Sequence, residues 1–325
     1  MRMIKQYILF LLMLLGFDLF AQQDAQYTQY MFNGLVINPA YAGNKGIFNI
    51  NGVYRDQWAG IDGAPRTMTI SVDGPIYKKT MALGLDIIKD KIGAQDLFSL
   101  YTSYSYRLKL SNEGTLSLGL ALGLTQYSFD GSQITLHDNT DLSKPGSLAS
   151  DLALDAKTGV YYSTNNFYSG FSVSNLFAPK IYNVDVNSDI PSFSTVGRHF
   201  FLNTGYIYEF DGPWKLYPSV LVKEDLKGPT NIDLNALALY NGALWFGMSY
   251  RTSLLWFKPH LDNNLKQTDV IALIFAIHLS DKIRVGYSYD ITTSELGHYD
   301  SGSHEISFAY FLYQRSTRML SPRYF

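Results

Sequence analysis

The clearest hydrophobic pattern in the chain lies between residues 115 and 127, where leucine occupies every second position. The alternating sets are Leu116, Leu118, Leu120, Leu122 and Leu124 against Ser117, Gly119, Ala121, Gly123 and Thr125. A strand places alternate side chains on opposite faces, whereas a helix would spread these leucines around its circumference. A leucine face opposite a small-residue face is typical of a strand with lipid outside and a crowded or wet barrel lumen inside.

The same two-residue period recurs along the chain and predicts about fourteen strands. Their predicted bounds are Ile47–Arg55, Arg66–Val72, Met81–Ile88, Leu97–Leu110, Thr115–Phe129, Leu152–Ser163, Phe167–Ser174, Arg198–Phe210, Lys215–Lys223, Asn231–Tyr240, Leu244–Ser253, Asp269–Leu279, Ile283–Ile291 and His304–Tyr313. The stretch Val270–Leu279 is apolar on both faces, so its pattern leaves its orientation open.

The predicted connections alternate in length. The short ones carry hairpin residues: Asp73–Pro75, Asn112–Gly114, Asn165–Asn166, Asp211–Pro213, Asn241–Gly242 and Ser280–Lys282. The others are mostly longer: Asp56–Pro65, Lys89–Asp96, Asp130–Asp151, Asn175–Gly197, Glu224–Thr230, Leu254–Thr268 and Thr292–Ser303. This alternation predicts an all-β, transmembrane, antiparallel outer-membrane barrel with short periplasmic turns and long outer loops. A soluble β-sandwich or propeller is the alternative, but it explains neither the small-residue faces nor the loop lengths.

Composition favours the membrane interpretation. Charged residues make up 17% of the 325 residues, against about 25% in typical soluble domains. The 25 tyrosines fit aromatic girdles at the membrane interfaces. The absence of cysteine excludes a disulfide scaffold and thiol chemistry. The formal net charge of −2 gives no basic footprint, so we expect no nucleic acid as a partner.

The first 21 residues predict a secretory signal peptide, with Arg2 and Lys5 before an apolar centre and Ala21 before the cleavage site. A bitopic anchor is the alternative, although the apolar stretch is short for a span. Residues 22–44 follow and are too apolar for a free tail. Because wall side chains cannot fill a barrel of this size, water or a plug must occupy the lumen. We therefore predict a signal peptide (1–21), a plug-like pre-barrel segment (22–44), the barrel (45–314) and a periplasmic tail (315–325).

Candidate chemistry is sparse. The six histidines are scattered, no phosphate-binding loop is present, and a faint calcium-loop pattern at Asp290–Ser294 has Glu295 where glycine is needed. We expect no cofactor, no metal and no enzymatic activity, although a Ser/His/Asp site assembled from distant strands stays open. Predicted lumen charges suit either a porin or a network of paired charges: Arg55, Asp86, Arg107, Lys109, Arg251, Arg284 and Asp290.

Several sequence blocks resemble the PorP/SprF family. Residues 24–33 (DAQYTQYMFN) and 38–43 (NPAYAG) are similar to its opening, and 54–60 (YRDQWAG), 63–67 (GAPRT) and 71–75 (SVDGP) to its first hairpin. Ser321 departs from the pattern, because some relatives have cysteine there. The residues that the resemblance marks as structural or partner-binding are Gln29, Tyr30, Phe32, Asn33, Asn38, Pro39, Gly43, Arg55, Trp58, Gly60, Pro65, Arg251, Asp290, His304, Glu305, Arg323 and Phe325.

The resemblance implies an outer-membrane component of the type IX secretion and gliding machinery that helps secrete or anchor a large surface adhesin. The implied partners are that adhesin, through its C-terminal sorting domain, the periplasmic ring components of the machinery, and outer-membrane lipid. The longest outer loops would contact the adhesin, and the tail Arg315–Phe325 would meet the periplasmic machinery or act only as an assembly signal. The alternative function is an outer-membrane porin or substrate channel.

Overall fold

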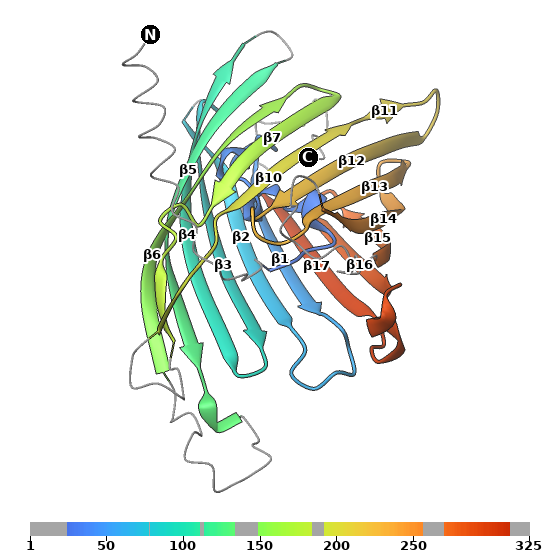
Figure 1. The fold of residues 1–325 in the computed structure, drawn as a ribbon. Coiled ribbons are helices and arrows are strands. Elements are labelled where there is room, and N and C mark those ends of the chain that lie inside the picture. The colour runs from blue at the N-terminus through green and yellow to red at the C-terminus, as the bar shows by residue number, and fades with distance from the viewer. Residues whose placement is uncertain are drawn as a thin grey trace, which may run out of the picture.

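The computed structural model describes residues 25–77, 79–110, 114–133, 149–183, 192–255 and 270–312. These residues form a sheet that closes on itself (Figure 1). The strands of the ring are β1 (Phe48–Asp56), β2 (Arg66–Tyr77), β3 (Met81–Ile92), β4 (Gln95–Lys109), β5 (Thr115–Phe129), β6 (Ala149–Ser163), β7 (Phe167–Ser174), β10 (His199–Tyr206) with its continuation β11 (Tyr208–Glu209), β12 (Trp214–Glu224), β13 (Thr230–Tyr240), β14 (Leu244–Leu254), β15 (Val270–Ser280), β16 (Ile283–Thr292) and β17 (Ser303–Leu312).

Two pairings close the ring. β1 pairs antiparallel with β17, from Phe48 opposite Leu312 to Asp56 opposite His304. β10 pairs with β12 and so joins the two halves of the chain. With β11 counted as part of β10, the described residues form a closed antiparallel barrel of fourteen strands, as predicted. A separate hairpin of β8 (Lys180–Asn183) and β9 (Ser192–Thr195) lies in the connection from β7 to β10.

The two faces of the strands divide as the sequence predicts. On β5, Leu118, Leu120, Leu122 and Leu124 are 41–58% exposed on the outer face, whereas the residues between them point inward. β15 places Ile271, Leu273 and Phe275 outward and Ala272, Ile274 and Ala276 inward, which assigns the faces that its sequence left open. Exposed aromatic rings gather near the short turns, where Trp214 packs against Tyr240 and Phe246.

Two predicted connections were wrong. Asp73–Pro75 does not form a turn, and β2 continues through it to Tyr77. The reason is that Asp73 points into the lumen, where it accepts hydrogen bonds from Gly43 N and from the side chain of Asn49. Lys89–Asp96 is no long loop, because β3 runs to Ile92 and β4 begins at Gln95. Gly93 has a φ of 55°, the left-handed conformation that a two-residue hairpin turn requires.

We call the end of the barrel that carries the β2–β3, β4–β5 and β15–β16 turns the short-turn end, and the opposite end the loop end. In outer-membrane barrels the short turns face the periplasm. Large parts of the predicted outer loops, and the whole tail Arg315–Phe325, lie outside the described residues. Among the described residues, no helix is long and apolar enough to cross a membrane.

Residues 25–47, which we call the lumen segment, run inside the ring and form three short 3₁₀ helices: η1 (Tyr30–Phe32), η2 (Gly34–Val36) and η3 (Pro39–Tyr41) (Figure 1). The side chain of Asn38 caps η3 by accepting a hydrogen bond from Ala40 N at 2.9 Å, and Pro39 occupies its first position. Every residue from Thr28 to Asn44 is buried. The lumen segment thus supplies much of the protein core.

Candidate functional site

The candidate site is the lumen itself, because the lumen segment extends along it from the loop end to the short-turn end. Near the loop end, the Tyr27 hydroxyl is 2.8 Å from Oγ1 of Thr69 on β2. Farther along, Asn33 donates a hydrogen bond to Ser71. At the short-turn end, the Ser163 hydroxyl, on the last residue of β6, donates to Oδ1 of Asn44. The segment is therefore anchored to the wall along its length.

Near the loop end, six charged side chains from consecutive parts of the wall form what we call the charged layer: Arg55, Lys223, Asp233, Arg251, Asp290 and Glu305. Arg55 pairs with Asp290 at 2.7 Å and with Glu305 at 3.2 Å. Asp233 pairs with Arg251 at 2.9 Å and with Lys223 at 3.0 Å. Three cations thus face three carboxylates. This balance matters, because an unpaired buried charge costs several kcal/mol of desolvation.

The lumen segment takes part in the charged layer through its backbone. The amides of Thr28 and Gln29 donate to the two carboxylate oxygens of Glu305 at 2.8 and 2.7 Å. The Thr28 hydroxyl donates to Asp290 at 2.7 Å and accepts a hydrogen bond from Arg55 at 2.9 Å. Charge-assisted bonds of this kind are about twice as strong as neutral ones. The layer therefore fixes the start of the segment as well as the wall.

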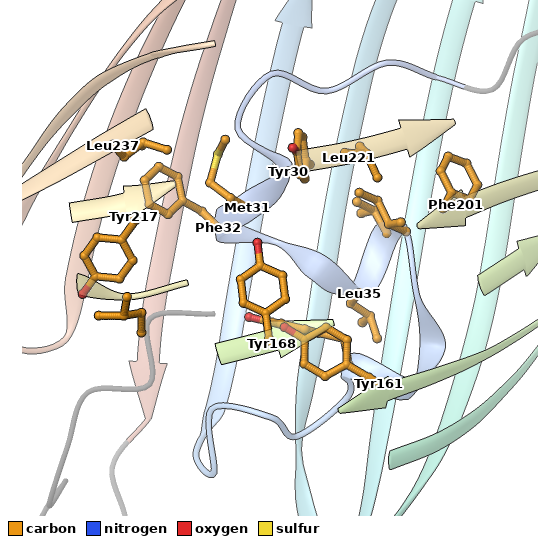
Figure 2. Close-up of a cluster of buried hydrophobic side chains, with 14 of the residues drawn as sticks. Tyr30, Met31, Phe32, Leu35, Tyr161, Tyr168, Phe201, Tyr217, Leu221 and Leu237 are labelled. Carbon is orange, nitrogen blue, oxygen red and sulfur yellow. The ribbon is translucent and has the colours of Figure 1, made fainter. Parts of the chain in front are cut away.

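Below the charged layer, aromatic and aliphatic side chains of the segment pack against the wall (Figure 2). Phe32 meets Trp245 of β14 edge-to-face at 5.4 Å between ring centroids. Tyr41 meets Tyr161 of β6 in the same way at 5.5 Å. Burial raises the pKa of Tyr30, so its hydroxyl stays protonated where it accepts a hydrogen bond from Asn235. This cluster forms a hydrophobic core in the middle of the lumen.

The small-residue face of the wall is the surface on which the lumen segment lies. A methyl group added to Gly119 would overlap the backbone of Pro39 and Ala40, and one added to Gly159 would overlap the Asn38 side chain. A methyl group at Gly286 would overlap Gln29. By contrast, nothing lies within 4 Å of the same position at Gly52, which alternates with the inward Asn51 and Val53 and so faces outward on β1. Gly119, Gly159 and Gly286 therefore mark contacts of the segment with the wall.

The structure brings many of the predicted site residues together in the lumen. Gln29, Arg55, Arg251, Asp290 and Glu305 meet in or beside the charged layer. Asn38 also bridges two wall strands, because its amide nitrogen donates to the carbonyls of Val160 and Phe171 at 3.1 and 3.3 Å. Tyr30, Phe32 and Pro39 are buried in the lumen segment, and Gly43 N donates to Asp73.

Other predicted residues lie elsewhere. Trp58, Gly60 and Pro65 belong to the β1–β2 connection, where Trp58 N donates to Ser303 Oγ at 3.1 Å. His304 lies on the outer side of β17, and its Nδ1 is 2.8 Å from the Tyr287 hydroxyl. Arg323 and Phe325 lie outside the described residues. The assignment of Lys109 to the lumen was wrong, because it is exposed where β4 ends.

Sequence reasoning missed Lys223 and Asp233. Asp233 is fully buried and accepts hydrogen bonds from two cations, but it is not among the predicted lumen charges. An isolated acid within the apolar run from Ile232 to Leu239 was the signal that could have found it. Within the described ranges, no three His, Cys, Asp or Glu side chains are grouped so that they could hold a metal ion.

Fold and site together define a class: an outer-membrane β-barrel whose lumen holds its own pre-barrel segment. The sequence model described as the type IX secretion system membrane protein PorP/SprF matches residues 19–310. The chain therefore belongs to the PorP/SprF family of type IX secretion system membrane proteins. No sequence among curated proteins is a significant match to it.

Solved structures support the fold. The CymD monoaromatic hydrocarbon channel is similar with a TM-score of 0.52 and 13% identity, over 87% of this chain and 93% of that chain. A FadL homologue from Pseudomonas aeruginosa is similar with a TM-score of 0.50 and 10% identity, over 86% of this chain and 93% of that chain. At these identities the likeness concerns the barrel fold.

Proposed function

We propose that this protein is a non-enzymatic outer-membrane component of the type IX secretion and gliding machinery that helps secrete or anchor one large surface adhesin. Membership of the PorP/SprF family supports the link to the machinery. The observation that favours a scaffold over a conduit is the lumen segment, which is buried and hydrogen-bonded to the wall from Thr28 to Asn44. A barrel filled in this way presents its two ends to partners.

In this proposal the adhesin binds at the loop end. The connections 130–151, 175–197 and 254–268 would contact the C-terminal sorting domain of the adhesin. The described β8–β9 hairpin gives the second of these loops a small sheet of its own. The tail 315–325, with three arginines, would contact the periplasmic ring components. We also propose that residues 1–21 direct export, so that the N-terminal residue of the purified protein is Gln22.

The proposal is tested by purifying the tagged protein in detergent from cells and identifying what is bound to it. We expect a large secreted adhesin, and a deletion strain should lose that adhesin from its surface while other secreted proteins stay. A matched strain that carries the chain with the β8–β9 hairpin replaced by a Gly-Ser linker should keep the barrel and lose the adhesin. Normal adhesin display in the deletion strain would contradict the proposal.

The second candidate is a porin or substrate channel, since CymD, whose fold is similar, is a monoaromatic hydrocarbon channel. For conduction here, the lumen segment would have to leave the charged layer or shift within it. Single-channel recording of the purified protein separates the two candidates. Steady large conductance favours the channel, and a closed barrel that still captures an adhesin favours the scaffold.

A further inference from the structure

Three potentially cationic side chains surround one ring at the short-turn end of the lumen. We call them the cationic cluster: Lys45, His278 and Arg284, with Phe311 at the centre. Lys45 Nζ is 5.4 Å from the centroid of Phe311, and the Arg284 guanidinium carbon is 5.9 Å from it. The His278 ring stacks on Phe311 at 6.0 Å with an interplanar angle of 18°. The three groups come from the lumen segment, β15 and β16.

Arg284 has no counter-charge among the residues that the structure describes. It is 4% exposed, and it makes no hydrogen bond or ion pair with the described residues. Its guanidinium instead lies against the face of Phe32, with its central carbon 4.1 Å from that ring centroid. A cation–π contact contributes up to about 2 kcal/mol, less than the several kcal/mol needed to desolvate a buried ion. Stacking alone therefore does not account for the burial of this arginine.

Among the described residues, Lys45 and His278 have no acidic hydrogen-bond partner either. Lys45 donates to the carbonyl of Phe32 at 3.1 Å and to the side-chain oxygen of Asn49 at 3.3 Å, both of which are neutral acceptors. Burial, and after it the charge of Arg284, lower the pKa of Lys45 to about 7. Nε2 of His278 is buried without a partner in the described part of the chain.

Asp73, the acid that interacts electrostatically with Lys45, is held by other hydrogen bonds. One of its carboxylate oxygens accepts from Asn49 at 2.6 Å, and the other accepts from Gly43 N at 2.8 Å. Arg107 also uses its donors locally, because it bonds the carbonyl of Gly43 at 2.7 Å. Asp281 of the β15–β16 turn interacts electrostatically with His278, and Asp73 interacts with Lys45, but no acid of the described residues does so with Arg284, unlike the cations of the charged layer.

The cationic cluster lies next to the barrel surface at that end. His278 N donates to the carbonyl of Ala243 in the β13–β14 turn at 2.8 Å. Phe311 N donates to the carbonyl of Lys282 in the β15–β16 turn, also at 2.8 Å. A ligand that reaches Arg284 from the short-turn end would have to pass these two turns. Because the face of the guanidinium is against Phe32, its in-plane N–H groups are the donors left for such a ligand.

We propose that the cationic cluster binds a carboxylate carried by an acidic peptide segment of a protein on the periplasmic side. The planar fork of an arginine matches a carboxylate through two parallel hydrogen bonds, which suits a side chain already oriented by stacking. The inference adds a binding site to the proposed function and does not depend on the adhesin.

The test uses the full-length protein in detergent and an acetylated pentaglutamate peptide, with pentaglutamine and inorganic phosphate as comparison probes. We expect pentaglutamate to bind and pentaglutamine not to bind, in titration calorimetry at low salt. Arg284→Met should weaken pentaglutamate binding by about tenfold or more, because it removes the bidentate charged contact. Lys91→Gln removes an exposed charge from the opposite, loop end of the barrel and should leave the affinity within about twofold of wild type.

The site of binding is read separately. Because the chain has no cysteine, Lys282→Cys at the short-turn end and Tyr299→Cys at the loop end can each carry one fluorophore. A quencher on the peptide should dim the first label and not the second. Equal quenching at both ends, or unchanged affinity in Arg284→Met, would overturn the proposal. If inorganic phosphate binds and pentaglutamate does not, the ligand is not an acidic peptide. If the peptide binds only after a protease has removed residues 315–325, the ligand of the site is the C-terminal segment of this chain and not a partner protein.

Discussion

The two ends of the lumen handle buried charge in opposite ways. At the loop end, Arg55 lies between Asp290 and Glu305, and the lumen segment adds hydrogen bonds to both acids. At the short-turn end, Arg284 is nearly as deeply buried, but its contacts within the described part of the chain are with the rings of Phe32 and Phe311. The comparison separates two uses of a lumen arginine. One holds the molecule together, and the other is left available for an anion.

The difference also distinguishes the two ends of the lumen segment. Its first residues, Thr28 and Gln29, are fixed by charge-assisted bonds. Its last residues before β1 include Lys45, whose acceptors are neutral. The start of the segment is therefore the better anchored part, and a partner that acts from the short-turn end would meet the less anchored part.

The largest expected effect comes from breaking the balanced end. Arg55→Met leaves Asp290 and Glu305 buried with a lost counter-charge, which costs about 3–5 kcal/mol of unfolding free energy. Urea unfolding, followed by gel mobility of unheated samples, measures this loss. The control is Arg66→Met, because Arg66 forms an exposed 3.2 Å pair with Asp56 that contributes about 0–1 kcal/mol. Equal losses in the two variants would show that the charged layer is not a special source of stability.

An intermediate effect is expected where the wall touches the middle of the lumen segment. Gly119→Val places a branched side chain against the backbone of Pro39 and Ala40, and overpacking of this kind costs about 1–3 kcal/mol. If the lumen segment, and not the wall, shifts to relieve this overlap, we expect conductance through the barrel to rise. Gly52→Val is the control, since that position has open space around it. A Gly119→Val protein with wild-type stability and a closed pore would contradict the contact.

Much of the barrel could be predicted from local pattern. The alternation of Leu118 and Leu120 with Ser117 and Gly119 is a property of neighbouring residues, and it fixed both the strand and its outer face. The turn at Asp73–Pro75 failed for a non-local reason. Its residues favour a turn, but Asp73 is needed in the lumen to bind Gly43, which lies 30 positions earlier in the chain.

The site was predictable only in part. Sequence pattern placed Arg55 and Arg284 alike, as charges on the inner face of a strand. Whether such a charge finds a partner depends on which strands meet around the ring and on the path of the lumen segment. Arg55 meets Glu305 because β1 and β17 close the barrel, a contact across 250 positions. No local signal reports that closure, and none reports that Arg284 has no acidic partner among the described residues.

The smallest stability effect is expected at the unbalanced end, and it sharpens the comparison most. Arg284→Met removes a buried cation that has no described counter-charge and keeps an apolar stem against Phe32 and Phe311. Relief of desolvation, several kcal/mol, offsets the lost cation–π contact of up to about 2 kcal/mol. We therefore expect the free energy of unfolding, without added anion, to equal or slightly exceed that of wild type. The same Arg→Met change at position 55 serves as the matched comparison. A loss at Arg284 as large as the loss at Arg55 would mean that the short-turn end has a counter-charge of its own, and the two ends would then no longer differ in kind.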